Sequence, residues 1–344
     1  MNEEQSDEKI SSHTSSNSSF PPILAVTGGK GGTGKTLIAT NLAVTFSKNN
    51  FKVLLVDCDV ENPNSYILLG KKLDDESVES QSIDIFVPKF NKNACVKCGD
   101  CQKACYRHAI LQFPDHFPSV MPHLCSGCEV CQKICSYNAI DSSYRPIGKK
   151  YYYPQTYEGL DLLVGELTPS EALSAHIVEH LIDEVQKPEI YSKYDLIIFD
   201  SAPGAHCDVE KILNASDMVI SITEPTPFGE HDLNRILELL EIIDKNSYFI
   251  INRANLTKEG EDLSKRLSSY ESIEYLGSVD VDKTLMEDYA LGEPFSLDPR
   301  TFPAKTQFLE IFEQIQEILT EEFLKTKKSS NENLKKQKIR EGDK

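Results

Sequence analysis

The chain has 344 residues, of which 40% are hydrophobic and 26% charged, and both shares are ordinary for a soluble globular protein of about two domains. Thirty-six Lys and Arg residues against 54 Asp and Glu residues give a net charge of −18, the wrong sign for a protein whose main partner is a phosphate backbone. The sequence shows neither a secretory signal nor an apolar run of about 18 residues that could cross a bilayer. We therefore expect a cytoplasmic protein that binds neither nucleic acid nor membrane.

Both ends of the chain are predicted to be tails. Residues 1–20 contain seven serines and have no apolar periodicity, so they cannot bury enough surface to offset the entropy of ordering, and we expect them to be disordered. Residues 325–344 contain eight Lys or Arg and three Asp or Glu residues. We interpret this second segment as a charged, solvated tail.

Between the tails, short apolar and β-branched runs alternate with longer helical patterns, which is typical of a mostly parallel α/β sheet. Most of the runs lack polar alternation, as expected for strands covered by helices on both faces. The predicted strands are Ile23–Thr27, Val53–Asp57, Leu162–Val164, Asp195–Asp200, Asp217–Ile222 and Ser247–Ile251, and the predicted helices include Lys35–Ser47, Pro169–Val185 and Gly229–Asp244. A last helical pattern, near Phe308–Phe323, has an apolar stripe opposite an acidic face, so we expect it to pack on the sheet and not on a membrane.

The alternation is interrupted once. From about Gly70 to Tyr153 the sequence has no long helical or strand pattern, and prolines, charges and cysteines dominate. We interpret this segment as a self-contained insertion between the second and third strands of the sheet.

A glycine-rich segment, Gly28–Thr36, directly follows the first predicted strand and opens the first predicted helix. Its sequence, GGKGGTGKT, fits G-x-x-x-x-G-K-T, in which backbone N–H groups surround phosphate oxygens. We expect Lys35 to reach the β- and γ-phosphates and the Thr36 hydroxyl to bind Mg²⁺. The residues expected to bind the nucleotide here are Gly29, Gly31, Gly32, Thr33, Gly34, Lys35 and Thr36.

With Lys30 included, the segment reads K-G-G-x-G-K-T and resembles the deviant Walker A motif of the MinD/ParA/Mrp group of P-loop ATPases, which also includes the nitrogenase iron protein. Three further segments carry the resemblance: VDCD at the end of the second predicted strand, FDSAPG at the end of a later one and INR at the end of another. The matches span about residues 22–325, with the insertion excepted. The resemblance implies an α/β P-loop NTPase fold with ATP and Mg²⁺ as cofactors.

The resemblance also implies catalytic roles. In such ATPases the first lysine of the loop reaches the phosphates of the facing subunit, so Lys30 implies a homodimer. Together with Lys35 it would neutralise phosphate charge. Asp59 would orient or activate the attacking water, with Asp57 supporting it, and Asp200 would hold Mg²⁺ through water.

Two further residues are assigned to the adenine end of the site by the resemblance. Asn252 sits where the family contacts adenine, and Pro225 belongs to a nearby base-pocket loop. Without the resemblance, each residue also has a purely structural interpretation. Asp59 could be an exposed carboxylate at the end of a strand, Asp57 could cap the following turn, and Asn252 could be a common turn residue. A position at the carboxyl edge of the sheet, beside a P-loop, favours the functional interpretation of the two aspartates.

Ten cysteines in a chain expected to be cytoplasmic point to metal, catalysis or burial, because disulfides do not persist in a reducing compartment. Eight of them lie between Cys95 and Cys135, in two C-x2-C-x2-C-x3-C runs that begin at Cys95 and Cys125 and agree at eight of sixteen aligned positions. The other two, Cys58 and Cys207, are expected to be free and buried or partly buried. For Cys207 the alternative is a bridging cluster at a dimer interface, because the nitrogenase iron protein has a cluster ligand in a comparable region.

The cysteine spacing resembles that of bacterial two-cluster ferredoxins, in which the fourth cysteine of each run serves the other cluster. The resemblance implies two [4Fe–4S] clusters: cluster I would take Cys95, Cys98, Cys101 and Cys135, and cluster II would take Cys105, Cys125, Cys128 and Cys131. Structural zinc is the alternative, but zinc sites use two-cysteine knuckles, whereas each run here has a third cysteine at the same spacing and a fourth. Tyr106 and Ser136 replace the proline of the ferredoxin pattern.

Together, the two resemblances point to the MinD-superfamily ATPases with an inserted ferredoxin domain. The expected parts are a disordered tail (1–20), a discontinuous P-loop ATPase domain (21–69 and 154–324), an insertion with a ferredoxin-like α+β domain (70–153, core 90–142) and a charged tail (325–344). We expect a homodimeric ATPase that couples nucleotide state to electron transfer with an unidentified redox or iron–sulfur partner protein. The alternatives are an Mrp-like iron–sulfur cluster carrier or maturation factor, and a ParA/MinD-like positioning ATPase with structural clusters, against which the acidic body argues.

Overall fold

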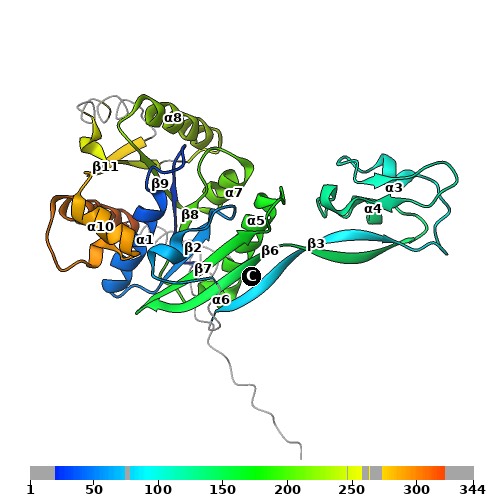
Figure 1. Cartoon of the computed structure of the whole chain (residues 1–344), viewed down its shortest axis with the longest axis horizontal. Helices are drawn as coiled ribbons and strands as arrows, with labels where there is room; N and C mark the ends of the chain where they lie inside the picture. The colour runs from blue at the N-terminus through cyan, green and yellow to red at the C-terminus, as the bar shows by residue number, and fades with distance from the viewer. Residues whose placement is uncertain (1–19, 74–77, 246, 258–262, 264–272, 322–344) are drawn as a thin grey trace, which may run out of the picture.

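The computed structural model describes residues 20–73, 78–245, 247–257, 263 and 273–321. In this part of the chain a central sheet has the strand order β11-β10-β9-β1-β8-β2-β7-β6-β3 (Figure 1). Its strands are β1 (Ile23–Thr27), β2 (Val53–Cys58), β3 (Glu79–Phe90), β6 (Ile140–Tyr157), β7 (Leu160–Leu167), β8 (Leu196–Ser201), β9 (Met218–Thr223), β10 (Ser247–Asn252) and β11 (Ile273–Val279). The strands from β11 to β7 in this order are parallel, and β6 and β3 are antiparallel. Apart from Phe20, the two predicted tails lie outside the described residues.

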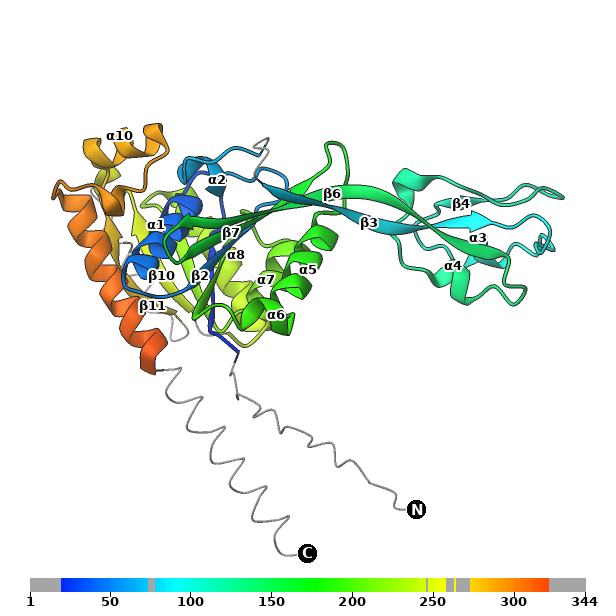
Figure 2. The ribbon, with the colours of Figure 1, turned by 90° about the horizontal axis from the view of Figure 1, so that it is seen from below.

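Helices cover both faces of the parallel part of the sheet (Figures 1 and 2). They are α1 (Lys35–Lys48), α2 (Ser65–Leu68), α5 (Ser174–Val185), α6 (Pro188–Tyr191), α7 (Cys207–Ala215), α8 (Pro227–Ile242) and α10 (Lys283–Leu291), with a further helix over residues 303–321. Ile23 and Ala25 pack with α5, α7 and α8, whereas Leu24 and Val26 pack with α1 and the helix over 303–321. Because helices cover both faces of the sheet, its strands are apolar throughout and show no alternation of apolar and polar residues. The predicted mostly parallel α/β sheet is confirmed.

The helix over residues 303–321 packs on the sheet as the last apolar stripe predicts. Phe308 and Ile315 are fully buried, and the ring of Phe312 lies edge-on to Phe46 of α1 with 4.7 Å between ring centroids. Phe323, the last member of the predicted stripe, lies outside the described residues. Within the described ranges, no helix is long and apolar enough to cross a lipid bilayer.

The insertion contains two long strands that the sequence analysis did not predict. β3 and β6 pair with each other, and β6 also pairs with β7, so the insertion extends the central sheet. The prediction that residues 70–153 lack a strand pattern is therefore wrong, and the expected boundary after residue 153 falls inside β6. β3 contains Pro88, and β6 contains Pro146 and Pro154. Proline removes a ladder donor and hides the strand pattern.

Beyond the stalk that β3 and β6 form, residues 91–139 make a small lobe (Figure 2). It contains α3 (Asp100–Lys103), β4 (Ile110–Leu111), β5 (Ser119–Val120), the 3₁₀ turn η1 (Pro122–Leu124) and α4 (Val130–Lys133). The sequence repeat is also a structural repeat, because left-handed backbone positions recur at equivalent places in the two cysteine runs. These pairs are Lys97 and Gly127, Gly99 and Glu129, and His108 and Asn138.

One predicted helix begins later than expected. α5 starts at Ser174, so the first residues of the predicted helix Pro169–Val185 form a loop instead. The other predicted strands and helices are present with small differences at their ends, where helix and strand limits are least defined by sequence.

Candidate functional site

The glycine-rich loop connects the carboxyl end of β1 to the start of α1. Gly32 and Gly34 have φ angles of +81° and +98°, a left-handed region that favours glycine. A Cβ atom on Gly34 would lie 2.2 Å from Nδ2 of Asn252. That amide donates a hydrogen bond of 2.8 Å to the carbonyl oxygen of Thr33. Asn252, at the end of β10, therefore supports the loop from the side.

Lys35 and Thr36 open α1 and line the cavity beside the loop. The Lys35 side chain is buried, and its Nζ donates a hydrogen bond of 3.1 Å to the carbonyl oxygen of Lys30. Burial lowers the pKa of Lys35, and the charges of Asp200 and Asp59 oppose that shift. The ammonium group is thus held inside the loop, where it can bind phosphate oxygens.

Asp57, at the end of β2, is fully occupied by hydrogen bonds. Its carboxylate accepts from the Ser65 hydroxyl at 2.6 Å and from the N–H groups of Asp59, Asn64 and Ser65 at 3.1, 3.0 and 2.9 Å. Burial raises the pKa of Asp57, and these hydrogen bonds oppose the shift. The carboxylate fixes the loop that carries Asp59, which suits the supporting role predicted for Asp57.

Asp200 is a buried carboxylate without such partners. It lies on β8, directly opposite Asp57 on β2, and beside Thr36. Neither of its carboxylate oxygens has a hydrogen-bond partner of normal geometry among the described residues. Burial, followed by the charge of Asp57, raises the pKa of Asp200 well above its ordinary value. Because a hard cation satisfies oxygen ligands of this kind, Asp200 and Thr36 fit Mg²⁺.

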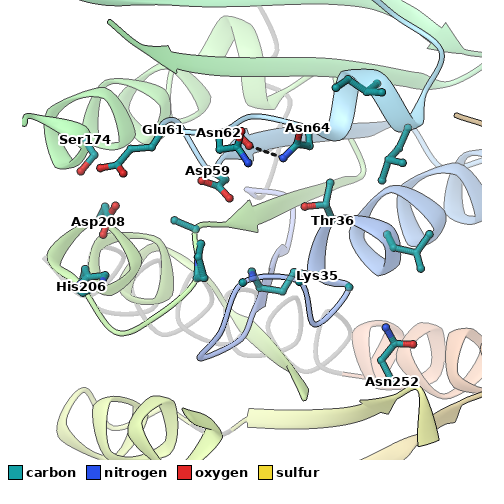
Figure 3. A pocket seen from close by; sticks show the side chains of 18 of the residues that line it. Lys35, Thr36, Asp59, Glu61, Asn62, Asn64, Ser174, His206, Asp208 and Asn252 are labelled. Atoms are coloured by element: carbon teal, nitrogen blue, oxygen red, sulfur yellow. Dashed lines mark hydrogen bonds between the residues drawn. The ribbon is translucent and has the colours of Figure 1, made fainter. Parts of the chain in front are cut away.

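A cavity of about 1240 Å³ lies beside the loop (Figure 3). Asp59 lines it, and burial, followed by the charge of Asp57, raises the pKa of Asp59 to about 7. On one side of Asp59 are Thr36 and Asn252, and on the other are Glu61, Ser174, His206 and Asp208 (Figure 3). The cavity therefore runs from the end of β10, past the P-loop, to the amino ends of α5 and α7.

The insertion lobe lines the same cavity. Tyr106 and Arg107 directly follow Cys105, and Ser126 directly follows Cys125, and all three line the cavity together with the P-loop. The Tyr106 and Ser126 hydroxyls are 2.9 Å apart and share a hydrogen bond. The P-loop and the residues that follow two of the eight clustered cysteines therefore border one space.

The predicted nucleotide-site residues that do not line this cavity include Gly29, Lys30, Thr33 and Pro225. The Nζ of Lys30 is 3.3 Å from Oε1 of Glu224. Gly29 packs against α8, where a Cβ atom would lie 2.1 Å from the carbonyl oxygen of Asp232. Pro225 lies in the short connection between β9 and α8. The close approach to α8 explains the need for glycine at position 29.

The eight clustered cysteines form two groups in the lobe. One small cavity is lined by Cys95, Cys98, Cys101 and Cys135, and a second by Cys105, Cys125, Cys128 and Cys131. Each group contains the fourth cysteine of the other run, in the arrangement that the ferredoxin resemblance implies. The N–H groups of Ala109 and Ala139 donate to the sulfurs of Cys105 and Cys135, both at 3.3 Å.

Each lobe cavity is lined by four cysteines. Among the described residues, no three Cys, His, Asp or Glu side chains surround a point closely enough to hold a single metal ion. A zinc site draws its sulfurs to about 2.3 Å from one ion, whereas an iron–sulfur cluster spreads four thiolates over several irons. Four thiols around each cavity match the number of thiolates that hold a [4Fe–4S] cluster.

The two remaining cysteines differ in exposure. Cys58 is fully buried between Asp57 and Asp59, as expected, and burial raises the pKa of its thiol well above the ordinary value. Cys207 is exposed and lines the large cavity, so the expectation of a partly buried thiol is wrong. It is the first residue of α7.

The site also contains residues that the sequence analysis did not identify. Glu224 is buried directly after β9 and forms ion pairs with Lys30 at 3.3 Å and Arg253 at 3.4 Å. Its position after a buried strand is the same signal that identified Asp59. Met286 and Tyr289 of α10 form part of an apolar wall of the cavity. The sequence does not predict this role, because apolar residues on a helix look the same in sequence whether they line a cavity or pack in the core.

Comparison with known proteins identifies the family. The CobQ/CobB/MinD/ParA nucleotide binding domain matches residues 24–295. An uncharacterized protein of Methanocaldococcus jannaschii is 33% identical over 274 residues, which cover 79% of this chain and 91% of the relative. An iron–sulfur cluster carrier protein of Pyrococcus abyssi is 23% identical over 312 residues, covering 87% and 86%. The structure of the septum site-determining protein MinD complexed with Mg-ADP, from Pyrococcus horikoshii, has a TM-score of 0.52 at 17% identity and covers 87% of this chain and 97% of that chain. The chain therefore belongs to the CobQ/CobB/MinD/ParA nucleotide-binding family and is a P-loop ATPase of the MinD/ParA type.

Proposed function

We propose that this ATPase carries two [4Fe–4S] clusters in its insertion lobe and couples its nucleotide state to electron transfer through them. The observation that carries the proposal is the shared cavity. Lys35 and Asp59 line it from the ATPase body, and Tyr106 and Ser126 line it from the lobe, next to cluster II cysteines. A change at the bound phosphates therefore takes place in a space that the cluster-bearing lobe itself borders.

The geometry supports the hydrolytic roles that we propose. Lys35 binds phosphate oxygens, and Thr36 with Asp200 holds Mg²⁺, which supplies neutralisation of phosphate charge. Asp59 orients the attacking water, and because burial raises its pKa to about 7, it can accept a proton near neutral pH. Asp57 keeps Asp59 in place through its hydrogen bond to the Asp59 N–H group.

We further propose that hydrolysis requires a homodimer. The Lys30 side chain does not line its own cavity, pairs with Glu224 and is 45% exposed, which leaves it accessible to a facing subunit. Lys30→Ala and Lys35→Ala should each abolish hydrolysis, whereas an equimolar mixture should recover activity, because each mixed dimer has one complete site. No recovery in mixtures that form dimers would show that Lys30 acts within its own subunit.

The cluster assignment is tested by anaerobic purification, spectroscopy and iron counting. The proposed clusters supply one-electron transfer, and two of them predict about eight iron atoms per chain. Cys98→Ser and Cys128→Ser should each lower the iron content and remove the signal of one cluster. Cys207→Ser is the matched control, because this thiol lies outside both lobe cavities. Zinc, or no metal, in the anaerobically purified protein would overturn the assignment.

The coupling is tested by comparing cluster potentials and electron-transfer rates with ATP and with ADP. We expect the two nucleotides to give different values and Lys30→Ala to remove the difference. If neither nucleotide nor this substitution changes either quantity, coupling is not the purpose of the lobe.

A second candidate is an iron–sulfur cluster carrier, which the similarity to the Pyrococcus abyssi protein of that name favours. A carrier must release its cluster, whereas each lobe cavity here offers four thiols drawn from both runs. Complete ligation of this kind favours clusters that stay. Rapid, ATP-dependent transfer of a cluster to an apo acceptor protein would favour the carrier instead.

A further inference from the structure

A largely buried ion pair joins the stalk of the insertion to the ATPase body. Arg145 lies on β6, and its Nη1 and Nη2 donate to Oε1 and Oε2 of Glu171 at 2.5 and 3.0 Å. The two side chains are only 13% and 10% exposed. Two parallel bonds between planar groups fix the orientation as well as the distance of the pair. The contact can therefore transmit a displacement from one side to the other.

On the body side, the pair reaches the nucleotide cavity. Glu171 belongs to the loop over residues 168–173 between β7 and α5, and the residue after it lines the cavity. The amide of Leu167, where this loop begins, donates a hydrogen bond of 2.7 Å to the carbonyl oxygen of Val60. Val60 directly follows Asp59. The loop is thus attached at its start to the proposed water-orienting segment.

On the lobe side, Arg145 binds next to a cysteine of cluster II. Its Nε donates a hydrogen bond of 3.0 Å to the carbonyl oxygen of Pro122, and the same oxygen accepts the Cys125 amide at 3.1 Å. His123, in the same turn, lies 3.9 Å from Glu171. One guanidinium group therefore contacts both the loop at the cavity and the carbonyl group that holds the Cys125 backbone.

The polar contacts near cluster I are of a different kind. The Lys97 side chain, beside Cys98, donates a hydrogen bond of 2.8 Å to the carbonyl oxygen of Asp115. The Gln112 side chain donates at 3.0 Å to the carbonyl oxygen of Lys97. Both bonds stay within the lobe. The link to the nucleotide cavity is therefore made on the cluster II side.

We propose that Arg145 is a positioning residue that transmits the nucleotide state of the cavity to cluster II in preference to cluster I. This inference rests on the proposed function and deepens it. When the loop that carries Glu171 shifts on nucleotide binding, the guanidinium follows, and the turn that holds Cys125 takes a new position. Cluster II is then the nucleotide-responsive cluster of the pair.

Hydrogen exchange of the anaerobically purified full chain, with and without Mg-ADP, tests this inference. In the wild type, exchange in residues 119–128 should change on Mg-ADP binding by about fivefold or more, the lower end of typical coupling between sites, and by less in residues 95–104. Arg145→Gln and Glu171→Gln should remove the response. Glu171→Gln leaves the bond from Arg145 to Pro122 in place, so it breaks only the body side of the link.

Lys150→Gln is the matched control. Lys150 also lies on β6 and forms an ion pair of similar burial, with Glu184 at 2.5 Å, but that pair does not reach the lobe. This variant should respond to Mg-ADP as the wild type does. Iron content and Mg-ADP affinity are measured on every variant, because they report on the proposed function separately. If iron and nucleotide bind but the wild type gives no response in residues 119–128, or both Arg145→Gln and Glu171→Gln keep it, the inference is overturned while the ATPase and cluster assignments stand.

Discussion

Asn252→Ala tests whether the end of β10 supports the P-loop or contacts the base. The amide of Asn252 is bonded to the carbonyl oxygen of Thr33 at 2.8 Å, and both residues are buried, at 4% and 2% exposed. Removing one partner of a buried hydrogen bond costs about 1–3 kcal/mol, because the other is left unsatisfied. We expect part of this free energy to be lost from the stability of the fold, where each kcal/mol lowers the Tm by about 2–4 °C. The rest should appear as a nucleotide Kd that is raised by up to about 150-fold.

Calorimetric titration with Mg-ADP and with magnesium pyrophosphate separates the two roles. Support of the loop predicts that both ligands bind more weakly by a similar factor, whereas a contact with the base predicts that only Mg-ADP does. Asn214→Ala is the control, because this exposed amide on α7 bonds, within the described part of the chain, only to the carbonyl oxygen of Glu210, at 3.0 Å. Its loss should change stability by no more than about 0.5 kcal/mol. An unchanged pyrophosphate affinity together with an unchanged Tm of Asn252→Ala would refute the reasoning.

Three further outcomes are expected. Because the fold raises the pKa of Asp59 from 3.8 to about 7, the nucleotide-free protein should lose stability as the pH rises through this range, whereas hydrolysis should rise. Asp59→Asn should remove the rise in hydrolysis from pH–rate profiles and make the loss of stability smaller in denaturation curves, although Asp57 and Asp200, whose pKa values are also raised, still contribute to that loss. An unchanged stability profile would contradict the shift. Gly34→Ala places a side chain at a φ of +98° and should lower the unfolding free energy by about 1–3 kcal/mol, measured by urea denaturation. Gly31→Ala, whose Cβ meets open space, should lower the unfolding free energy by less. Equal decreases in the two variants would argue against backbone strain at Gly34. Phe312→Ala should lower the unfolding free energy by about 3–5 kcal/mol, whereas Glu313→Ala, on the exposed face of the same helix, should change it by no more than about 0.5 kcal/mol. Similar thermal unfolding of the two variants would disprove the packing of this helix on the sheet.

The parallel part of the fold was predictable from sequence because its strands are buried on both faces. Val53–Asp57 and Asp217–Ile222 are nearly continuous apolar runs, and no surface helix or turn has that composition. β3 and β6 have a different environment. The start of β3 is exposed, and in β6 buried tyrosines are interspersed with polar residues and Pro146. These two strands are specified mainly by their pairing with each other, which a single sequence does not show.

The local parts of the site were predictable for a similar reason. The P-loop and each cysteine run lie within short segments, so their spacing alone expresses the geometry of phosphate or metal binding. The contacts that hold these parts in place join distant segments. Asn252 and Thr33 are 219 residues apart, and Arg145 and Glu171 are 26 apart. Neither contact follows a helical or strand period, so no pattern in the sequence predicts it.

The stalk also determines how the chain can fold. β2 and β7 are neighbours in the sheet, although the whole insertion separates Val53 from its partner Leu160 along the chain. The β3–β6 hairpin shortens this path, because Glu79 pairs with Tyr152. Once the hairpin has formed, only the connection from β2 to Glu79 and the short segment from Tyr152 to Leu160 remain to be closed. Since closing a shorter loop loses less entropy and non-local pairing slows folding, we expect the hairpin to form before β7 joins β2. The lobe is then synthesised and ordered before β7 pairs with β2. The rate at which the ATP site assembles at the end of β2 therefore depends on the rate at which the lobe and its hairpin form.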